Sequence, residues 1–338
     1  MTTGVPEMLE GPSGPVADSA GEQVAARSPL QLFWRQLRGD KVALAALIVI
    51  VILLLIAIFA PLVTKLAGAP RYDQGDVNAL HPNDLELFGL PQGPSSKHLF
   101  GVTPQTGYDV FSRVIYGTRV SLLVAFVATG LSALIGVTVG LLAGYYRGWV
   151  DTILSRTMDV VLAFPIFLLA LGLAASCTIV DSDGKQGCLG GLIKPGLTVV
   201  IVVIVISTWP YFARIIRGQV LSMREKEFVE AARSLGASDR RIIFREILPN
   251  LVTTIMVYAT LLIPSNILFE AALSFLGVGV QEPTPSWGKM IADATSGFND
   301  HWWFMLFPGI ALLTTVLAFN LLGDGLQDAI NPRSRGRD

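Results

Sequence analysis

Six long segments of this chain contain no Asp, Glu, Lys or Arg. A helix needs about 20 predominantly apolar residues to cross the ~30 Å hydrocarbon core of a bilayer. Backbone amides inside lipid must be satisfied within the segment itself, which favours helices. The alternative, buried helices of a soluble protein, is disfavoured by the number of such segments. We therefore predict an all-α polytopic membrane protein with six transmembrane helices, at residues 42–64, 120–146, 160–180, 195–213, 247–269 and 301–323.

The composition excludes several other classes of protein. Charged residues make up 15% of the chain and hydrophobic residues 52%, whereas charged residues approach a quarter of an ordinary soluble domain. The net charge of −1 gives no basic field that would indicate a nucleic-acid partner. Two cysteines and three histidines are too few for a disulfide-rich scaffold or a His-rich metal site. No segment matches the phosphate-binding pattern G-x-x-x-x-G-K-[ST], so any ATP chemistry is expected on another chain.

The distribution of Lys and Arg predicts the orientation in the membrane. Eight of these residues lie in the connector 214–246. Short loops rich in Lys and Arg stay on the cytoplasmic side. We therefore expect this connector, and with it both termini, to be cytoplasmic.

These assignments divide the chain into five parts. The first part is rich in Gly, Pro, Ala and Glu without periodicity, which is typical of disorder, and it lacks the apolar core of a signal peptide. In the third part, Pro and Gly residues predict an irregular connector, in which a strand pair is possible but cannot be located. The predicted parts are a disordered cytoplasmic tail (1–27), an interfacial helix plus the first span (28–64), an extracytoplasmic connector (65–119), a five-helix core containing the cytoplasmic segment 214–249 (120–323), and a cytoplasmic tail (324–338).

The cytoplasmic segment contains the pattern of a short amphipathic helix. Phe228, Ala231, Ala232 and Leu235 recur at i, i+3, i+4 and i+7, so they share one helix face. The two alanines keep this face thin, so that another backbone can approach it closely. Gly236 is placed to adopt the left-handed conformation that ends a helix.

The same segment resembles the coupling-helix signature of ABC importer permeases. The resemblance rests on Glu230-Ala231-Ala232, Gly236 and Leu248-Pro249. Further segments are similar to the second permease of dipeptide, oligopeptide and nickel importers, namely residues 209–214, 228–239, 272–281, 283–288 and 318–326. The similarity extends from about residue 100 to residue 333.

This resemblance implies a non-catalytic permease subunit with the type I ABC importer fold, in the plasma (inner) membrane of a bacterium. Such a chain would form half of a peptide translocation pathway and dock on a separate ATPase through residues 228–236. The implied partners are a second homologous permease, two ATPase domains or subunits that bind ATP and Mg²⁺, an extracytoplasmic solute-binding protein and the lipid bilayer. Nickel and oligosaccharides are alternative solutes. A gradient-driven transporter or channel is disfavoured, because the six segments contain no Asp, Glu, Lys or Arg for proton coupling.

Three polar residues of the fifth span are candidates for the translocation pathway. Ser265 and Asn266 lie beside a proline, and polar groups in a span usually face protein or water; hydrogen bonding to a neighbouring helix is the equal alternative. Glu270 ends its apolar segment, so it is either a pathway residue or a carboxylate hydrated at the interface. The triplet 270–272 is a second Glu-Ala-Ala, but this topology places it outside, beyond the reach of a cytoplasmic ATPase.

Two further predictions concern packing. Cys177 and Cys188 flank an outer loop and either form a disulfide or remain two small hydrophobic residues. Four glycines of the second span have the spacing of small residues that permits close helix packing: Gly130, Gly136, Gly140 and Gly144.

Overall fold

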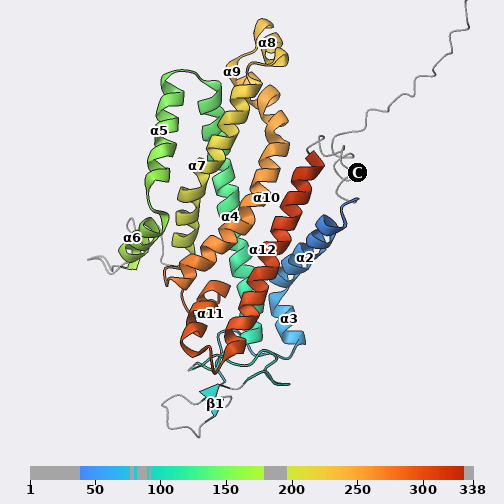
Figure 1. Cartoon of the computed structure of the whole chain (residues 1–338), viewed down its shortest axis with the longest axis vertical. Coiled ribbons are helices and arrows are strands. Elements are labelled where there is room, and N and C mark those ends of the chain that lie inside the picture. The colour runs from blue at the N-terminus through green and yellow to red at the C-terminus, as the bar shows by residue number, and fades with distance from the viewer. Residues whose placement is uncertain are drawn as a thin grey trace, which may run out of the picture.

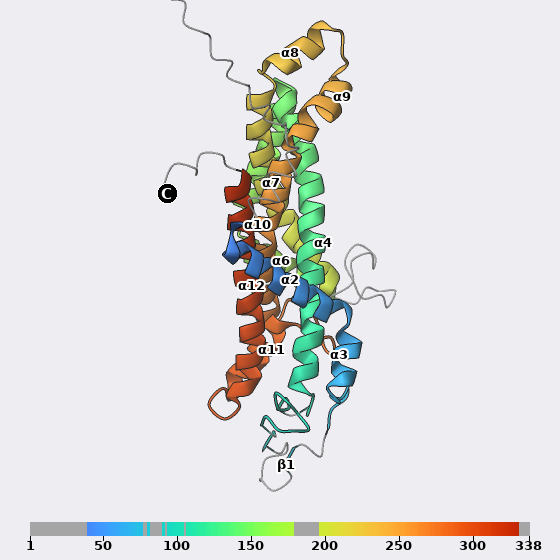
Figure 2. The same ribbon diagram turned by 90° about the vertical axis from the view of Figure 1, so that its right-hand side faces the viewer.

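The computed structural model describes residues 39–76, 80–81, 90–91, 93–104, 106–178 and 196–330. The predicted N-terminal tail and interfacial helix, the whole outer loop at 181–194 and the end of the C-terminal tail lie outside these residues. The structure is an elongated bundle of helices (Figures 1 and 2). The helices are α2 (Lys41–Ile58), α3 (Ala60–Leu66), α4 (Val110–Tyr145), α5 (Trp149–Ala163), α6 (Ile166–Thr178), α7 (Leu197–Met223), α8 (Glu227–Ser234), α9 (Asp239–Arg241), α10 (Leu248–Phe275), α11 (Trp287–Ala294) and α12 (Trp302–Ile330).

Shorter elements complete the described part of the chain. A π-helical segment, Ile242–Ile247, joins α9 to α10, and a 3₁₀ turn, Thr295–Gly297, follows α11. The connector between α3 and α4 contains one antiparallel strand pair, β1 (Leu80–His81) and β2 (Leu90–Pro91).

The predicted all-α membrane fold is confirmed. Five helices are long and apolar enough to cross a membrane: α2, α4, α7, α12 and the continuous helix Asp239–Phe275 that includes α10. A sixth span results if α5 and α6 are taken together.

The third span differs from its prediction as one helix at 160–180. The helix is interrupted between α5 and α6, and the axes of these two helices differ by 80°. Phe164 ends α5 in an extended conformation, with ψ 132°, because the proline ring of Pro165 disfavours a helical conformation in the preceding residue. Pro165 is therefore the sequence signal that indicates the break.

The second span also begins earlier than predicted. Helix α4 starts at Val110, so the outer connector ends at Asp109 rather than at residue 119. The carboxylate of Asp109 accepts a hydrogen bond of 2.8 Å from the backbone N–H of Ser112 and caps the helix. At about 1.5 Å per residue the 36-residue helix is roughly 54 Å long. The helix is therefore longer than the hydrocarbon core is thick. For this reason the first charged residue next to the apolar segment does not mark the end of the helix.

Helices α4 and α7 make the most extensive helix–helix contact in the described part of the chain. A Cβ atom at Gly136, Gly140 or Gly144 would lie 2.6–2.7 Å from an atom of α7. The predicted close packing is confirmed for these three glycines. It is wrong for Gly130, which has open space where a Cβ would be.

Helix α2 packs outside this pair, against α12 and α4 (Figure 2). The start of α2 lies beside the end of α12, where a Cβ at Gly325 would be 2.4 Å from the Cβ of Ala43. The first and last described helices therefore begin and end in the same half of the molecule, the half that carries α8 at its tip (Figures 1 and 2). We refer to this tip as the α8 end. The opposite tip, which carries the strands, α3 and α11, is the strand end.

Candidate functional site

Helix α8 projects at one tip of the bundle, between the end of α7 and the π-helical segment that leads into α10 (Figures 1 and 2). Gly236 has φ +79°, as predicted for a residue that closes a helix. Its N–H donates to the carbonyl of Arg233, and the N–H of Ala237 donates to the carbonyl of Ala232, both at 3.0 Å. This pair of hydrogen bonds is the Schellman motif. The helix therefore ends abruptly and the chain turns back towards the bundle.

Only one residue of α8 is fully buried. Val229 is 0% exposed and joins an apolar cluster formed by the ends of α4 and α7 and the π-helical segment. In contrast, Leu235 is 88% exposed and Phe228 and Ala231 are also exposed. Three residues of the predicted apolar face are therefore exposed, whereas Ala232 is half-buried against the same cluster. Val229, which the periodicity did not indicate, holds the helix to the bundle.

Polar contacts hold the base of this projection. The hydroxyl of Tyr145, the last residue of α4, donates a hydrogen bond of 2.7 Å to Asp239. The Arg224 guanidinium donates to the carbonyl of Gly144 at 2.8 Å. Arg233, a permanent positive charge on α8, lies beside Tyr145, and this contact raises the pKa of Arg233 further above its ordinary value. The end of α4 thus contacts both sides of the α8 segment.

Ion pairs connect α5 to α7 near the same tip. Arg217 binds Asp151 with two hydrogen bonds, of 2.6 and 2.8 Å, and Arg214 binds Asp159 at 2.8 Å. The bidentate geometry fixes both the distance and the orientation of the two groups. These ion pairs therefore join α5 to α7 near this tip.

The structure places Glu270 differently from the interfacial interpretation. The residue is 0% exposed, so it is not a carboxylate hydrated at the membrane surface. Its two carboxyl oxygens accept hydrogen bonds from Ser121 on α4, at 2.9 Å, and from Ser274 on α10, at 2.7 Å. These serines compensate for the cost of burying a polar group. Ser274 lies one helical turn from Glu270, at i+4, whereas no local sequence pattern indicates Ser121, which is remote from Glu270 in the chain.

The other two pathway candidates separate from one another. Ser265 is exposed on the surface of α10, whereas Asn266 is 0% exposed. The side-chain amide of Asn266 donates to the hydroxyl of Thr129 on α4 at 2.8 Å. The alternative of a hydrogen bond to a neighbouring helix is therefore confirmed for Asn266. Of the cysteines, Cys177 is disulfide-bonded, and Cys188 lies outside the described residues.

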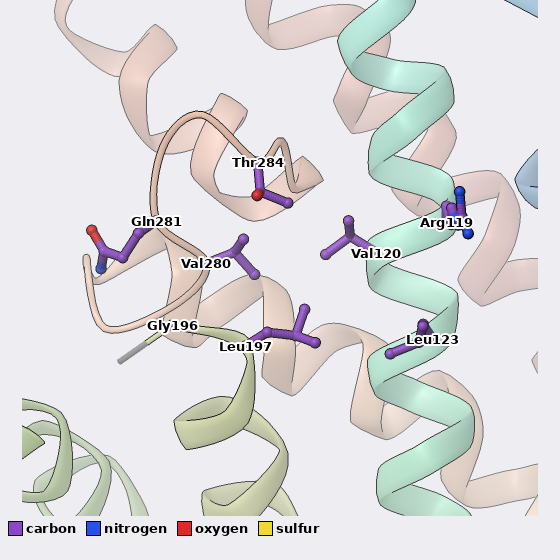
Figure 3. Close-up of a pocket in the computed structure, with 8 residues that line it drawn as sticks. All are labelled: Arg119, Val120, Leu123, Gly196, Leu197, Val280, Gln281 and Thr284. Atoms are coloured by element: carbon purple, nitrogen blue, oxygen red, sulfur yellow. The ribbon is translucent and has the colours of Figure 1, made fainter. Parts of the chain in front are cut away.

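A hollow of about 390 Å³ opens between α4, the start of α7 and the segment that joins α10 to α11 (Figure 3). Its walls include Val120 and Leu123 of α4, and Val280, Gln281 and Thr284 of the joining segment. Within the described ranges no group of three or more His, Cys, Asp or Glu residues could hold a metal ion.

Comparisons with known proteins agree with this architecture. Residues 136–336 match the family model described as binding-protein-dependent transport system inner membrane component, and residues 28–82 match the N-terminal TM domain of oligopeptide transport permease C. The dipeptide transport system permease protein DppC of Alkalihalophilus pseudofirmus is 40% identical over 98% of this chain and 97% of its own length. The glutathione transport system permease protein GsiD of Pectobacterium atrosepticum is 38% identical over 91% and 93%, respectively.

The solved structures show the same fold. A structure of the inward-facing MetNI methionine ABC transporter superposes with a TM-score of 0.52 at 18% identity, covering 65% of this chain and 97% of the matched chain. The family match covers more than half of the sequence and includes the segment that carries α8. The chain is therefore a multi-pass inner-membrane protein that belongs to the binding-protein-dependent transport family, the permease subunits of ABC importers.

Proposed function

We propose that the chain forms one half of the translocation pathway of an ATP-driven peptide importer and that α8 is the helix on which an ATPase docks. The observation that carries the proposal is the contrast between Leu235, which directly follows α8 and is 88% exposed, and Val229, which lies within α8 and is 0% exposed. A leucine side chain that is exposed to water does not stabilise the folded tip. The same side chain buried in a pocket of a partner protein contributes about 1.5–3 kcal/mol to binding. The buried valine keeps the helix attached when a partner moves it.

The charges of the bundle support a cytoplasmic position for the α8 end. The loops and helix ends of this tip carry most of the arginines of the described helices, including Arg147, Arg224, Arg240, Arg241 and Arg245. The positive-inside rule places such segments in the cytoplasm. Both termini would then be cytoplasmic and the strand end extracytoplasmic, where a solute-binding protein would approach.

The remaining parts of the machine are proposed on separate chains. A second permease would complete the pathway, and two ATPase domains would bind ATP and Mg²⁺. ATP can drive the pathway between two states only if the ATPases contact α8 differently in each state. Peptides are the proposed solute, because the similar proteins include a dipeptide permease and a glutathione permease.

Co-purification and uptake test this proposal. The complex is purified through an affinity tag on the second permease. This chain carries either the substitution Leu235→Asp or the control substitution Leu66→Asp. Leu66 is 79% exposed at the strand end, so it matches Leu235 in exposure but not in location. We expect Leu235→Asp to release the ATPases and stop uptake of a labelled dipeptide, and Leu66→Asp to retain both. Retention of the ATPases by Leu235→Asp would refute docking on α8. Uptake of Ni²⁺ or an oligosaccharide in place of the dipeptide would refute the proposal that the solute is a peptide.

A further inference from the structure

The segment that joins α10 to α11, residues 276–286, is folded against the bundle at several points. We call it the strap. Figure 3 shows Val280, Gln281 and Thr284 of the strap around the hollow, opposite Val120 of α4. The strap therefore forms a wall of this hollow, and its position sets the width of the opening.

A buried hydrogen-bond network centred on Glu270 holds both ends of the strap. Ser274, in the last turn of α10 just before the strap, donates to one carboxyl oxygen and accepts a long hydrogen bond of 3.4 Å from the backbone N–H of Val280. Ser286, the last residue of the strap, lies near the carboxyl group and caps α11 by accepting a hydrogen bond from the backbone N–H of Lys289. Ser121 brings α4 to the same carboxyl group. All four side chains are 0% exposed.

Neighbouring contacts leave little room for other arrangements. The indole N–H of Trp287 donates to the carbonyl of Val114 at 3.1 Å. A Cβ at Gly288 would lie 2.3 Å from the carbonyl oxygen of Ala271. Helix α11 is thus pressed against α4 and α10 directly beside the carboxyl group, and Glu270 is the point at which α4, α10 and α11 meet.

We propose that Glu270 is a positioning residue for transport, which holds the strap and α11 on α4 and so maintains the hollow at the extracytoplasmic end of the pathway. Because it is fully buried, it acts through the strap and does not contact the solute. The inference rests on the proposed function, since it assumes that solute passes the strand end.

The chemistry of the network explains why a long side chain with two polar atoms is required. A carboxyl group offers two oxygens to separate hydroxyl donors, and a glutamine side chain offers one acceptor and one donor in the same positions. Serine hydroxyls rotate and can accept as well as donate, so Glu270→Gln retains the network. Glu270→Ala removes both polar atoms, leaves buried hydroxyls without partners and opens a cavity.

The experiment compares four variants in the complete complex, reconstituted in proteoliposomes. Glu270→Ala and Glu270→Gln test the carboxyl group. Ser121→Ala removes the α4 contact alone. Thr138→Ala is the control for that change, because this exposed hydroxyl on α4 bonds only to its own helix, at the carbonyl of Leu134. Each is measured for uptake of a labelled dipeptide and, in a Val120→Cys/Val280→Cys background, for oxidative cross-linking across the hollow by mass spectrometry.

We expect Glu270→Ala and Ser121→Ala to lower uptake about tenfold and to reduce the cross-link, as for the loss of a buried hydrogen-bond centre. Glu270→Gln should stay within about twofold of wild type, because it restores the hydrogen bonds. A purely structural defect would reduce the amount of assembled complex and not the cross-link per complex.

Wild-type uptake and cross-linking in Glu270→Ala would overturn the proposal. If the complex with Glu270→Ala does not assemble, the Ser121→Ala variant provides the test. A cross-link in Ser121→Ala that equals the wild-type value would also overturn the proposal. A wild-type complex that does not take up the dipeptide would refute the proposed solute instead, while the cross-link still reports the position of the strap.

Discussion

Substitution of Gly140 by alanine tests the close approach of α4 and α7. The added Cβ would lie 2.7 Å from the carbonyl oxygen of Ala213 and 2.8 Å from the Cβ of Ile216. Ordinary contacts between carbon atoms are about 3.5–4.0 Å, so the two helices must separate by close to 1 Å. Overpacking of this kind costs about 1–3 kcal/mol. It is partly offset by the higher helix propensity of alanine, about 1 kcal/mol relative to glycine.

Gly130→Ala is the matched control on the same helix. It gains the same propensity without crowding, because nothing lies within 4 Å of its Cβ position. The difference between the two variants therefore isolates the crowding. At about 1–2 °C per kcal/mol for a chain of 338 residues, Gly140→Ala should unfold roughly 1–6 °C below Gly130→Ala when the detergent-purified permease is followed by tryptophan fluorescence. Equal unfolding temperatures would contradict the packing of α4 on α7.

Three further predictions concern contacts at the two tips. Val229→Ala should cost about 1–2 kcal/mol of local stability, seen as faster hydrogen exchange across α8; unchanged exchange would mean that Val229 does not hold the helix. A double-mutant cycle on Asp151 and Arg217, whose side chains are 27% and 29% exposed, should give a coupling energy below about 1 kcal/mol. A much larger value in thermal unfolding would show that solvent does not screen the pair. Glu282→Ala should destabilise by more than the ±0.5 kcal/mol of an ordinary surface change. The reason is that Glu282→Ala leaves Arg113, whose side chain is 2% exposed, without its ion-pair partner. An unfolding temperature equal to that of wild type would refute this predicted destabilisation.

The sequence predicts the features that depend on local chemistry. Uncharged segments locate the membrane-crossing helices, because hydrocarbon excludes charge over a fixed thickness. Gly236 is recognised as a helix end because its neighbours change from periodic to polar and glycine tolerates positive φ. The proline at position 165 would also have revealed the break in the third span, since its effect on Phe164 is local.

The sequence does not predict features that depend on distant partners. Charge alone places the start of the second span too late, because the uncharged segment begins after Arg119, which is exposed within α4. Arg113, earlier in the same helix, is paired with Glu282, far along the chain, at 2.6 Å. The burial of Glu270 depends on Ser121 and Ser286, which only the fold brings together. Hydropathy records how apolar a residue is, and it does not record which neighbours satisfy a polar one.

Site-specific photocross-linking from α8 in the intact complex tests the central claim most directly. A photoreactive amino acid replaces Leu235, and the same residue at Leu66 serves as the control at the opposite tip. The account predicts an adduct between position 235 and an ATPase subunit, with a yield that changes when ATP binds, and no such adduct from position 66. Labelling of position 235 by solvent or lipid alone, in a complex that still contains its ATPases, would contradict it.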